Sequence, residues 1–210
     1  MGHSEYDPAA KERHPWNVGR MVFAKRALKP QQVQAIRFWL DREWRLRDRA
    51  MFDLAIDSKL RGCEVVKVRI GYLVNGGQIR SRAIVAQQET GRPVQFVLLE
   101  PARDSVLVWL ERPGGTIDEF AFPSRIEHTD HISTRQYARL VDEWVTWIGL
   151  RPEDDGTHSL RRTKASIIYK QAGDQRGAQM LLGRTKIEGT VRYLGADVGD
   201  ALALAEGTEV

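Results

Sequence analysis

Apolar residues between positions 30 and 58 recur every three or four residues, which is the period of an amphipathic α-helix. Proline is favoured at the first helical position, so a helix is expected to begin at Pro30. Its inward side chains are predicted to be Val33, Ile36, Leu40 and Trp44. A second helix, expected to end near Ser58, is marked by Leu46, Ala50, Met51, Leu54 and Ala55.

The next stretch changes to a period of two, which indicates β-strands. Residues 66–70 and 79–86 alternate in this way, and Asn75-Gly76-Gly77 between them is typical of a hairpin turn. A further turn over 87–92 leads into an expected strand at 93–98. The pattern therefore predicts a small antiparallel sheet of about three strands.

Helical periodicity then returns. Residues 100–110 are predicted to form a helix with Val106, Leu107 and Leu110 facing inward. Ser133 and Gln136 have the spacing of a capping box, and Gly149 can end the helix that they begin. The apolar positions of that helix are expected in the core: Tyr137, Leu140, Val141, Trp144 and Ile148.

The last quarter of the chain is also predicted to be helical. Gly156 precedes a helix that carries His158 and Arg161, and Asp174, Thr185 and Asp197 are candidate caps of three more helices. Helices that surround one small antiparallel sheet make an α+β fold rather than an alternating α/β fold. We expect a basic arm over residues 1–29, followed by one domain over residues 30–210.

Charge is distributed unevenly along the 210 residues. The net charge is +4, yet residues 1–50 carry 11 Lys/Arg against 6 Asp/Glu, and residues 156–195 carry 8 against 2. This concentration of basic residues in the arm and in the last quarter favours a polyanionic partner. Solvated helix faces can carry the same charges without any partner.

Composition also restricts the compartment. Cys63 is the single cysteine, so no internal disulfide can form, and a reducing environment fits. No apolar run approaches the length of a membrane span, and the N-terminus lacks the apolar core of a signal peptide. A cytoplasmic protein without a membrane partner is therefore expected.

The basic last quarter holds residues suited to one kind of chemistry. His158 and Arg161 are three positions apart, so they lie on one face of a helix, and Tyr193 and Arg61 supply a phenol and a second guanidinium. Arginine binds two phosphate oxygens, histidine transfers protons near neutral pH, and a tyrosine phenol can attack phosphorus. These are the groups that transesterification of a phosphodiester requires, without a metal, nucleotide or other cofactor.

The same residues, taken in order, resemble the catalytic domain of the tyrosine recombinases of the phage-integrase type. The resemblance covers roughly residues 30–205. It rests on Arg61 with Glu64, the pair His158-x-x-Arg161, the step Leu182-Gly183-x-Thr185, and Tyr193.

This resemblance implies a site-specific recombinase that cleaves and rejoins DNA through a 3′-phosphotyrosyl intermediate. It assigns Tyr193 as the nucleophile, Arg61 and Arg161 as the phosphate clamp, and His158 as an acid/base helper. Glu64 is expected to brace Arg61. Double-stranded DNA is the implied partner, and self-association on DNA is expected. The C-terminal apolar face formed by Val198, Ala201, Leu202 and Leu204 is expected either to dock on a neighbouring subunit or to pack back in cis.

Two positions depart from the family pattern. Arg184 stands where histidine or tryptophan is usual, and it can still donate to phosphate. Glu89 stands in the hairpin turn where these enzymes carry a general-acid lysine. A carboxylate about 4 Å from a phosphate oxygen is repelled by roughly 4 kcal/mol at an effective dielectric near 20. Unless Arg82 or Arg92 neutralises Glu89, or the loop holds it outside the cleft, slow cleavage or none is expected.

Only about thirty residues precede the first helix, so the N-terminal helical domain that helps such recombinases clamp DNA is expected to be missing or supplied by another chain.

Three other functions stay open. A catalytically impaired relative that binds DNA or regulates a recombinase is the closest alternative. Type IB topoisomerases share the residue set, and the region 174–187 loosely fits a helix-turn-helix repressor. His128-x-x-His131 lacks a third ligand, so no metal is predicted there.

Overall fold

The computed structural model describes residues 25–88, 91, 93–111 and 115–172. The elements in chain order are α2 (Pro30–Arg42), α3 (Leu46–Ser58), α4 (Gly62–Val65), α5 (Ile70–Leu73), β1 (Val74–Asn75), β2 (Gln78–Ile79), β3 (Arg82–Ala86), β4 (Pro93–Val97), α6 (Glu100–Leu110), α7 (Thr134–Trp147) and α8 (Thr157–Ala172). The predicted α+β class, mostly helical with small antiparallel sheets, is confirmed.

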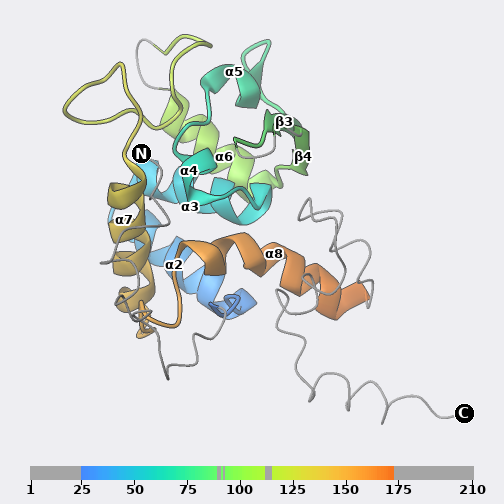
Figure 1. The fold of residues 1–210 in the computed structure, drawn as a ribbon, viewed down its shortest axis with the longest axis vertical. Helices are drawn as coiled ribbons and strands as arrows, with labels where there is room; N and C mark the ends of the chain where they lie inside the picture. Colours follow the sequence, from blue (N-terminus) through green and yellow to red (C-terminus); the bar gives the residue numbers. More distant parts are fainter. Residues whose placement is uncertain (1–24, 89–90, 92, 112–114, 173–210) are drawn as a thin grey trace, which may run out of the picture.

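Helix α3 lies at the centre of this arrangement. Ten of its thirteen residues are buried, and it packs against α2, α6 and α8. Figure 1 shows α3 and α4 between α8 on one side and α5, α6, β3 and β4 on the other. A helix that is covered on several sides must also bury polar groups, and these need partners. Asp53 is one of them: it binds Arg37 of α2 and Ser105 of α6.

The predicted helices before and after the strands are present. Pro30 begins α2, and α3 ends at Ser58. Ser133 caps α7 by accepting a hydrogen bond from the Gln136 N–H at 3.1 Å, and Gly149 follows α7 with φ 78°. The aromatic positions of α7 are in the core, as expected, because Tyr137 and Trp144 are fully buried.

Two inward positions were predicted wrongly. Trp44 lies beyond the end of α2, in a left-handed conformation (φ 53°), and is 82% exposed. The helix ends at Arg42 because the chain turns there into α3, so the three-four spacing no longer applies at Trp44. Leu107 of α6 is also exposed, since α6 contacts α3 with the face that carries Ala102 and Val106.

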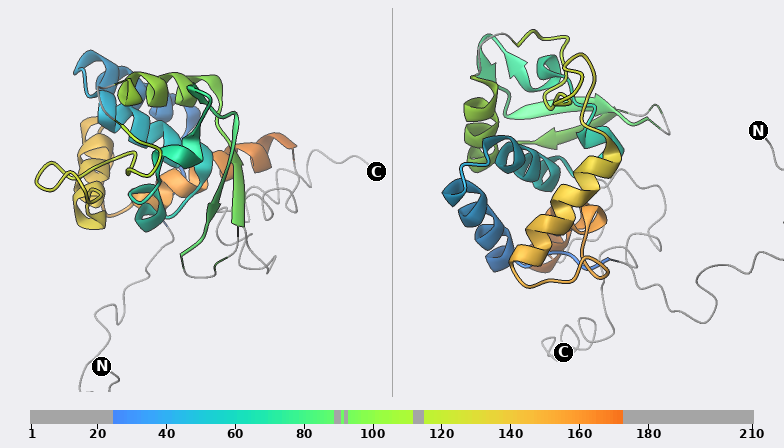
Figure 2. Two further views of the ribbon diagram at one scale, coloured as in Figure 1. Left: turned by 90° about the horizontal axis from the view of Figure 1, so that it is seen from above. Right: turned by 90° about the vertical axis from the view of Figure 1, so that its left-hand side faces the viewer.

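The strands are arranged as two separate pairs rather than one sheet of three. Among the described residues, β1 pairs only with β2, and β3 pairs only with β4, both antiparallel. The turn between β1 and β2 is at Gly76-Gly77, as the sequence predicts, and both glycines have positive φ. The predicted strand 79–86 is interrupted at residues 80 and 81, where the chain passes from β2 to β3. In Figure 2, β3 and β4 run side by side away from α6.

The predicted strand over 66–70 is wrong. Its alternating residues are buried at Val66 and Val68, but the backbone leaves α4 in a turn and pairs at only one position, between Arg69 and Phe120. The Val68 carbonyl accepts the Ala121 N–H at 2.8 Å, and then α5 begins at Ile70. The alternation therefore reflects burial against residues 119–121 rather than a strand.

Candidate active site

Arg61 lies at a sharp break between α3 and α4. The break is made by Lys59, which has left-handed backbone angles (φ 56°, ψ 22°), and by Leu60, whose buried side chain anchors it. Arg61 itself is extended and precedes the first residue of α4. Its side chain is about one quarter exposed, so it can meet a ligand at the surface.

Glu64 holds Arg61 in place through two contacts. One carboxylate oxygen accepts the Arg61 backbone N–H at 2.7 Å, and the other lies 3.3 Å from Arg61 Nη1. The Glu64 side chain is 1% exposed, so this brace is shielded from water and screened little by salt. Glu64 is therefore placed as a buried group that positions the surface cation of Arg61.

Gly62 brings this segment against α7 and the start of α8. A Cβ atom at Gly62 would lie 3.1 Å from Tyr137 Cε1 and 3.8 Å from Thr157 Cβ. Only a glycine permits such close approach without a shift of the buried Tyr137 ring. The neighbouring Arg61 is thereby held beside the first turn of α8.

Helix α8 carries the other two predicted residues in its first two turns. Ser159 Oγ accepts the Gly156 N–H at 3.1 Å at the start of this helix. Leu160 is fully buried, and on the other faces His158 is exposed while Arg161 is 8% exposed. Leu160 anchors the helix to the core, so that His158 and Arg161 are presented next to each other.

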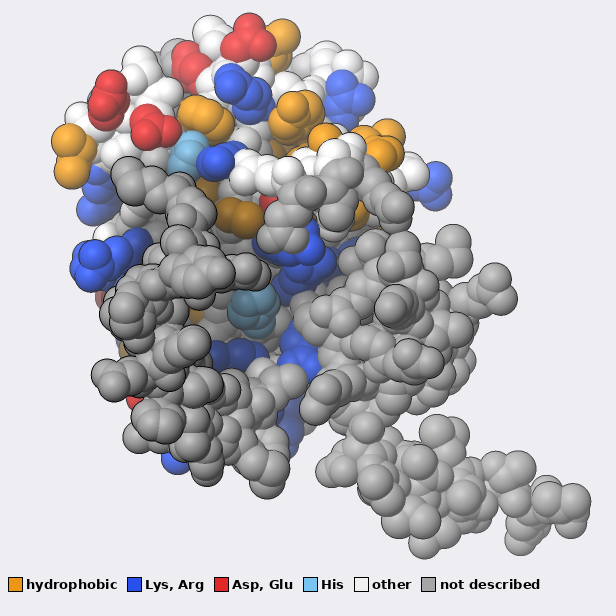
Figure 3. All heavy atoms as spheres, in the orientation of Figure 1, with side chains coloured by type: hydrophobic (Ala, Val, Ile, Leu, Met, Phe, Trp, Pro, Cys, Tyr) orange, Lys and Arg blue, Asp and Glu red, His pale blue; other side chains and the backbone are white. Residues whose placement is uncertain are grey.

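Four cations from three segments surround His158. The pKa of His158 is lowered, first by burial of its ring among neighbouring groups and then by the charges of Arg161, Arg162, Lys25 and Arg61. Although the residue as a whole is exposed, enough protein surrounds the imidazole for burial to act. Figure 3 shows Lys and Arg side chains gathered around a histidine in the middle of this face. The neutral imidazole is favoured, and the cluster is suited to bind an anion.

The segment 25–29, here called the strap, runs along α8 and brings one of these cations to the site. Lys25 Nζ donates to the carbonyls of Pro152 and Glu153, both at 2.6 Å, and Arg162 donates to the Lys25 carbonyl. Further along the strap, the Leu28 N–H donates to Thr163 Oγ1 at 3.0 Å. This end of the predicted basic arm is therefore packed on the helix of His158.

The structure thus brings together Arg61, Glu64, His158 and Arg161, whereas Glu89, Arg184 and Tyr193 lie outside the described residues. So do the predicted C-terminal helices. The hairpin that carries position 89 is described on both sides of it: Gln87 is buried, and its carbonyl accepts the Gly91 N–H at 2.8 Å. Lys67 Nζ lies 3.4 Å from Gln88 Oε1, next to that position.

Sequence reasoning missed two members of the basic cluster. Arg162 follows Arg161 directly, but a charged residue on a helix is usually solvent-facing, and its burial against the strap has no signal in the sequence. Lys25 was placed in the basic arm, without an assigned role in the site. The excess of basic residues over 1–50 and over 156–195 was the available indication of such a cluster.

Two histidines, His128 and His131, lie in the loop between α6 and α7. His131 packs its ring on Phe120, and its Nδ1 lies 2.8 Å from the Ile132 carbonyl. Within the described residues, no group of three metal-binding side chains is present. In the same part of the chain, no helix has the length and apolar character to cross a membrane.

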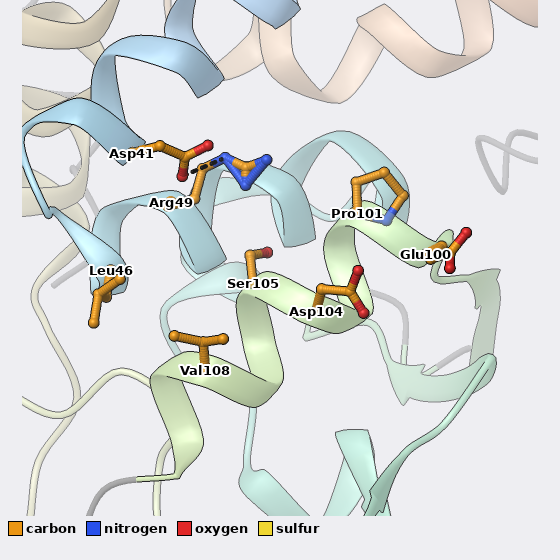
Figure 4. Close-up of a pocket in the computed structure, with 8 residues that line it drawn as sticks. All are labelled: Asp41, Leu46, Arg49, Glu100, Pro101, Asp104, Ser105 and Val108. Carbon is orange, nitrogen blue, oxygen red and sulfur yellow. Dashed lines mark ion pairs between the residues drawn. The ribbon is translucent and has the colours of Figure 1, made fainter.

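A pocket of about 420 Å³ opens elsewhere, between α6 and the junction of α2 with α3. Figure 4 shows its lining: Asp41, Leu46, Arg49, Glu100, Pro101, Asp104, Ser105 and Val108. Three carboxylates and one guanidinium line it, and Arg49 Nε is 3.5 Å from Asp41 Oδ1. This acidic pocket is unsuited to a phosphate and contains none of the residues around His158.

Comparison with known proteins supports one family. Residues 26–198 match the model of the Phage integrase family. Tyrosine recombinase XerC of Xylella fastidiosa (strain 9a5c) is 28% identical over 196 residues, which are 93% of this chain and 64% of that protein. The chain therefore spans somewhat less than two thirds of the length of this relative.

Solved structures agree in fold. The crystal structure of XerA recombinase has a TM-score of 0.72 at 16% identity, over 89% of this chain and 65% of that one. A XerH site-specific recombinase bound to palindromic difH substrate, in a post-cleavage complex, has a TM-score of 0.69 at 16% identity, over 92% and 55%. With a family match over most of its length and the fold of these recombinases, the chain belongs to the phage integrase family.

Proposed function

We propose that this chain is the catalytic part of a site-specific tyrosine recombinase, which cleaves and rejoins double-stranded DNA. The observation that carries the proposal is the cluster of Arg61, Arg161, Arg162 and Lys25 around His158. Family membership supports it. The chain covers 64% of its XerC relative, and residues 30–210 are proposed as the catalytic domain.

The proposed reaction is a transesterification. The phenolic oxygen of Tyr193 attacks the scissile phosphorus, the bond from phosphorus to the 5′-oxygen breaks, and a 3′-phosphotyrosyl linkage remains. Arg61 and Arg161 neutralise the charge of the non-bridging oxygens, and Arg184 adds a third donor. Attack of a 5′-hydroxyl on this linkage reverses each step and rejoins the strand.

His158 has the properties of the proton acceptor in this scheme. Its lowered pKa favours the neutral imidazole, which can take the phenolic proton of Tyr193. The leaving 5′-oxygen also needs a proton, which the family takes from the hairpin lysine. Here that position is Glu89, so this second transfer is the weak step of the proposal.

Glu89 favours a second candidate function, that of a catalytically impaired relative which binds DNA or regulates a recombinase. In this case the basic cluster would still bind the phosphate, since Arg61, Arg161 and the strap do not depend on the hairpin turn. Binding to DNA and self-association on DNA are proposed for both functions. The solved XerH complex and a λ integrase dimer bound to a COC′ core site are structural relatives in which DNA is bound.

The test is a covalent-trapping assay on nicked duplex DNA, read as a protein–DNA adduct on a denaturing gel. The adduct should vanish in Tyr193→Phe while DNA binding survives. Arg161→Ala should raise the barrier by on the order of 3 kcal/mol, because one charge-assisted contact to the transition state is lost. An adduct that persists in Tyr193→Phe, or near-normal cleavage by Arg161→Ala, would contradict the proposal.

A second assay separates the two functions at the hairpin. We expect Glu89→Lys to raise adduct formation at least tenfold, since a general acid typically contributes roughly 10²- to 10⁴-fold. Glu89→Gln measures removal of the carboxylate alone, and Gln88→Lys is the matched control one residue away. A substrate with sulfur in place of the leaving 5′-oxygen needs no proton and should gain less. If Glu89→Lys leaves the rate unchanged on both substrates, the hairpin turn is not at the site.

A further inference from the structure

Asp57, the second-last residue of α3, binds two other parts of the chain through one buried carboxylate. Its Oδ1 accepts Lys164 Nζ at 2.7 Å, and its Oδ2 accepts the Leu99 N–H at 2.7 Å. The side chain is 3% exposed. Both oxygens are therefore used, and both partners lie far away in sequence, at separations of 107 and 42 positions.

One partner of Asp57 lies on the helix of His158 and Arg161, and the other follows the hairpin that contains position 89. Lys164 lies three positions after Arg161 on α8, and its Nζ is also 3.4 Å from the Val97 carbonyl of β4. Leu99 follows β4 and caps α6, so it fixes the end of the hairpin whose turn holds position 89. Asp57 itself is four positions before Arg61. One carboxylate thus joins the Arg61 segment, the hairpin and α8.

The surrounding charges make this connection specific to a carboxylate. Lys59 Nζ donates to the Asp57 carbonyl at 3.2 Å, so two ammonium groups share the neighbourhood of one acid. Burial, followed by the charge of Lys164, lowers the pKa of Lys59 to about 8. An amide at position 57 has one oxygen and one N–H₂ group, so the N–H₂ would face either Lys164 Nζ or the Leu99 N–H. That donor would then have no acceptor.

We propose that Asp57 is a positioning residue, which holds strand β4 against the helix of His158 and Arg161 and thereby sets where the hairpin turn lies relative to the scissile phosphate. The proposal rests on the proposed function for the identity of the reaction. It adds a residue that touches neither DNA nor the reacting atoms. Lys164 is its required partner.

Asp53 provides a matched control. It lies one turn earlier on α3, its side chain is 0% exposed, and it binds three groups: Arg37 Nε at 2.7 Å, Arg49 Nη1 at 2.9 Å and Ser105 Oγ at 2.9 Å. These groups belong to α2, α3 and α6, and none lies on α8 or the hairpin. Asp53→Asn and Asp57→Asn therefore remove the same charge from the same helix, but only the second touches the proposed connection.

The experiment measures single-turnover cleavage of nicked DNA at saturating protein, at a temperature below the Tm of each variant. If the unmodified chain cleaves slowly, all variants are made in a chain that also carries Glu89→Lys. Asp57→Asn should lower the rate at least tenfold, and Asp53→Asn less than threefold, even where both lower the Tm. In the double variant Asp57→Asn with Lys164→Gln, the two amides can bind each other. This variant should recover at least half of the decrease in the logarithm of the cleavage rate.

Hydrogen exchange supplies a readout that needs no activity. The Leu99 amide and the amides of β4 should exchange at least tenfold faster in Asp57→Asn than in Asp53→Asn, and the double variant should recover. Equal rates and equal exchange in the two single variants would overturn the proposal. If the unmodified chain and its Glu89→Lys variant form no adduct at all, the proposed function fails, and the exchange result alone decides the role of Asp57.

Discussion

Lys59 combines two unfavourable features at one position. Its backbone is left-handed, which costs a residue other than glycine about 1–2 kcal/mol, and the residue, which carries an amine, is only 4% exposed. The break before Arg61 thus requires a backbone conformation that lysine disfavours. The Asp57 carbonyl accepts a hydrogen bond from the buried Lys59 amine. The local cost is borne by the burial of α3 before the break and of α4 after it.

Lys59→Met should therefore stabilise the fold near neutral pH. The pKa of Lys59 is about 8 in the folded chain, below its ordinary value of 10.5, so the unfolded chain binds the extra proton between these pH values. The penalty is fully present below pH 8 and disappears as the pH rises to 10.5. It amounts to at most about 3 kcal/mol, and the lost hydrogen bond offsets about 1 kcal/mol.

The measurement is urea unfolding of both proteins from pH 7 to 10.5. Lys59→Met should be more stable by about 2 kcal/mol at pH 7, and the difference should shrink as the pH approaches 10.5. A constant difference across this range would mean that the Lys59 amine does not titrate in the folded chain.

At the scale of elements, the α4–α7 contact sets the direction of Arg61. Gly62→Ala places a Cβ atom 3.1 Å from the ring of Tyr137, which is fully buried and would have to shift by a few tenths of an ångström against the core. We expect a loss of stability of about 1–3 kcal/mol, typical of overpacking, together with a loss of cleavage. Gly115→Ala is the control, because its Cβ also meets an atom at 3.1 Å, but that atom is the flexible end of Ile70.

The two alanine variants are compared by thermal unfolding and by adduct formation at a temperature where both are folded. Gly62→Ala should lose adduct beyond what its lower stability explains, since Arg61 is the next residue. Gly115→Ala should stay close to the unmodified chain in both measurements. If Gly62→Ala forms the adduct at the normal rate, the position of α4 is not critical for Arg61.

Elements with a local signal were predictable from sequence, whereas those fixed by distant contacts were not. Ser133 and Pro30 mark helix starts through capping and a preset φ, which are properties of the residues themselves. Residues 66–70 alternate like a strand, yet their burial comes from residues 119–121, which lie fifty positions away. The same limit applies to the site. Arg61, His158 and Arg161 were found by motif, but Asp57 and Lys164 meet only through the fold.

For the whole molecule, the placement of charge should decide how the proposed DNA partner is bound. The described cations around His158 come from the strap, the Arg61 segment and α8, so binding should depend steeply on salt. Lys25 is held by two carbonyls at the edge of this cluster and has no part in the chemistry. Its contribution should therefore be electrostatic and independent of DNA sequence.

Lys25→Ala should weaken binding to specific and unrelated duplexes alike. The slope of log K against log salt should fall in magnitude by about one, which is the loss of one phosphate contact. Fluorescence anisotropy between about 50 and 200 mM salt measures this slope. Lys67→Ala, which removes an exposed cation beside Gln88, shows whether the effect is specific to the strap. An unchanged slope in Lys25→Ala would place the DNA away from the strap.

The central position of α3 has a consequence for the order in which the chain is completed at the ribosome. Asp57 is made 107 residues before Lys164, and at typical rates of synthesis this interval lasts roughly 5–20 s. Until α8 emerges, the side of α3 that it covers stays exposed, and Arg61 has neither His158 nor Arg161 beside it. The nascent chain is therefore open to aggregation until α8 covers α3. It stays incapable of the proposed cleavage until Tyr193, 29 residues after Lys164, has also been made.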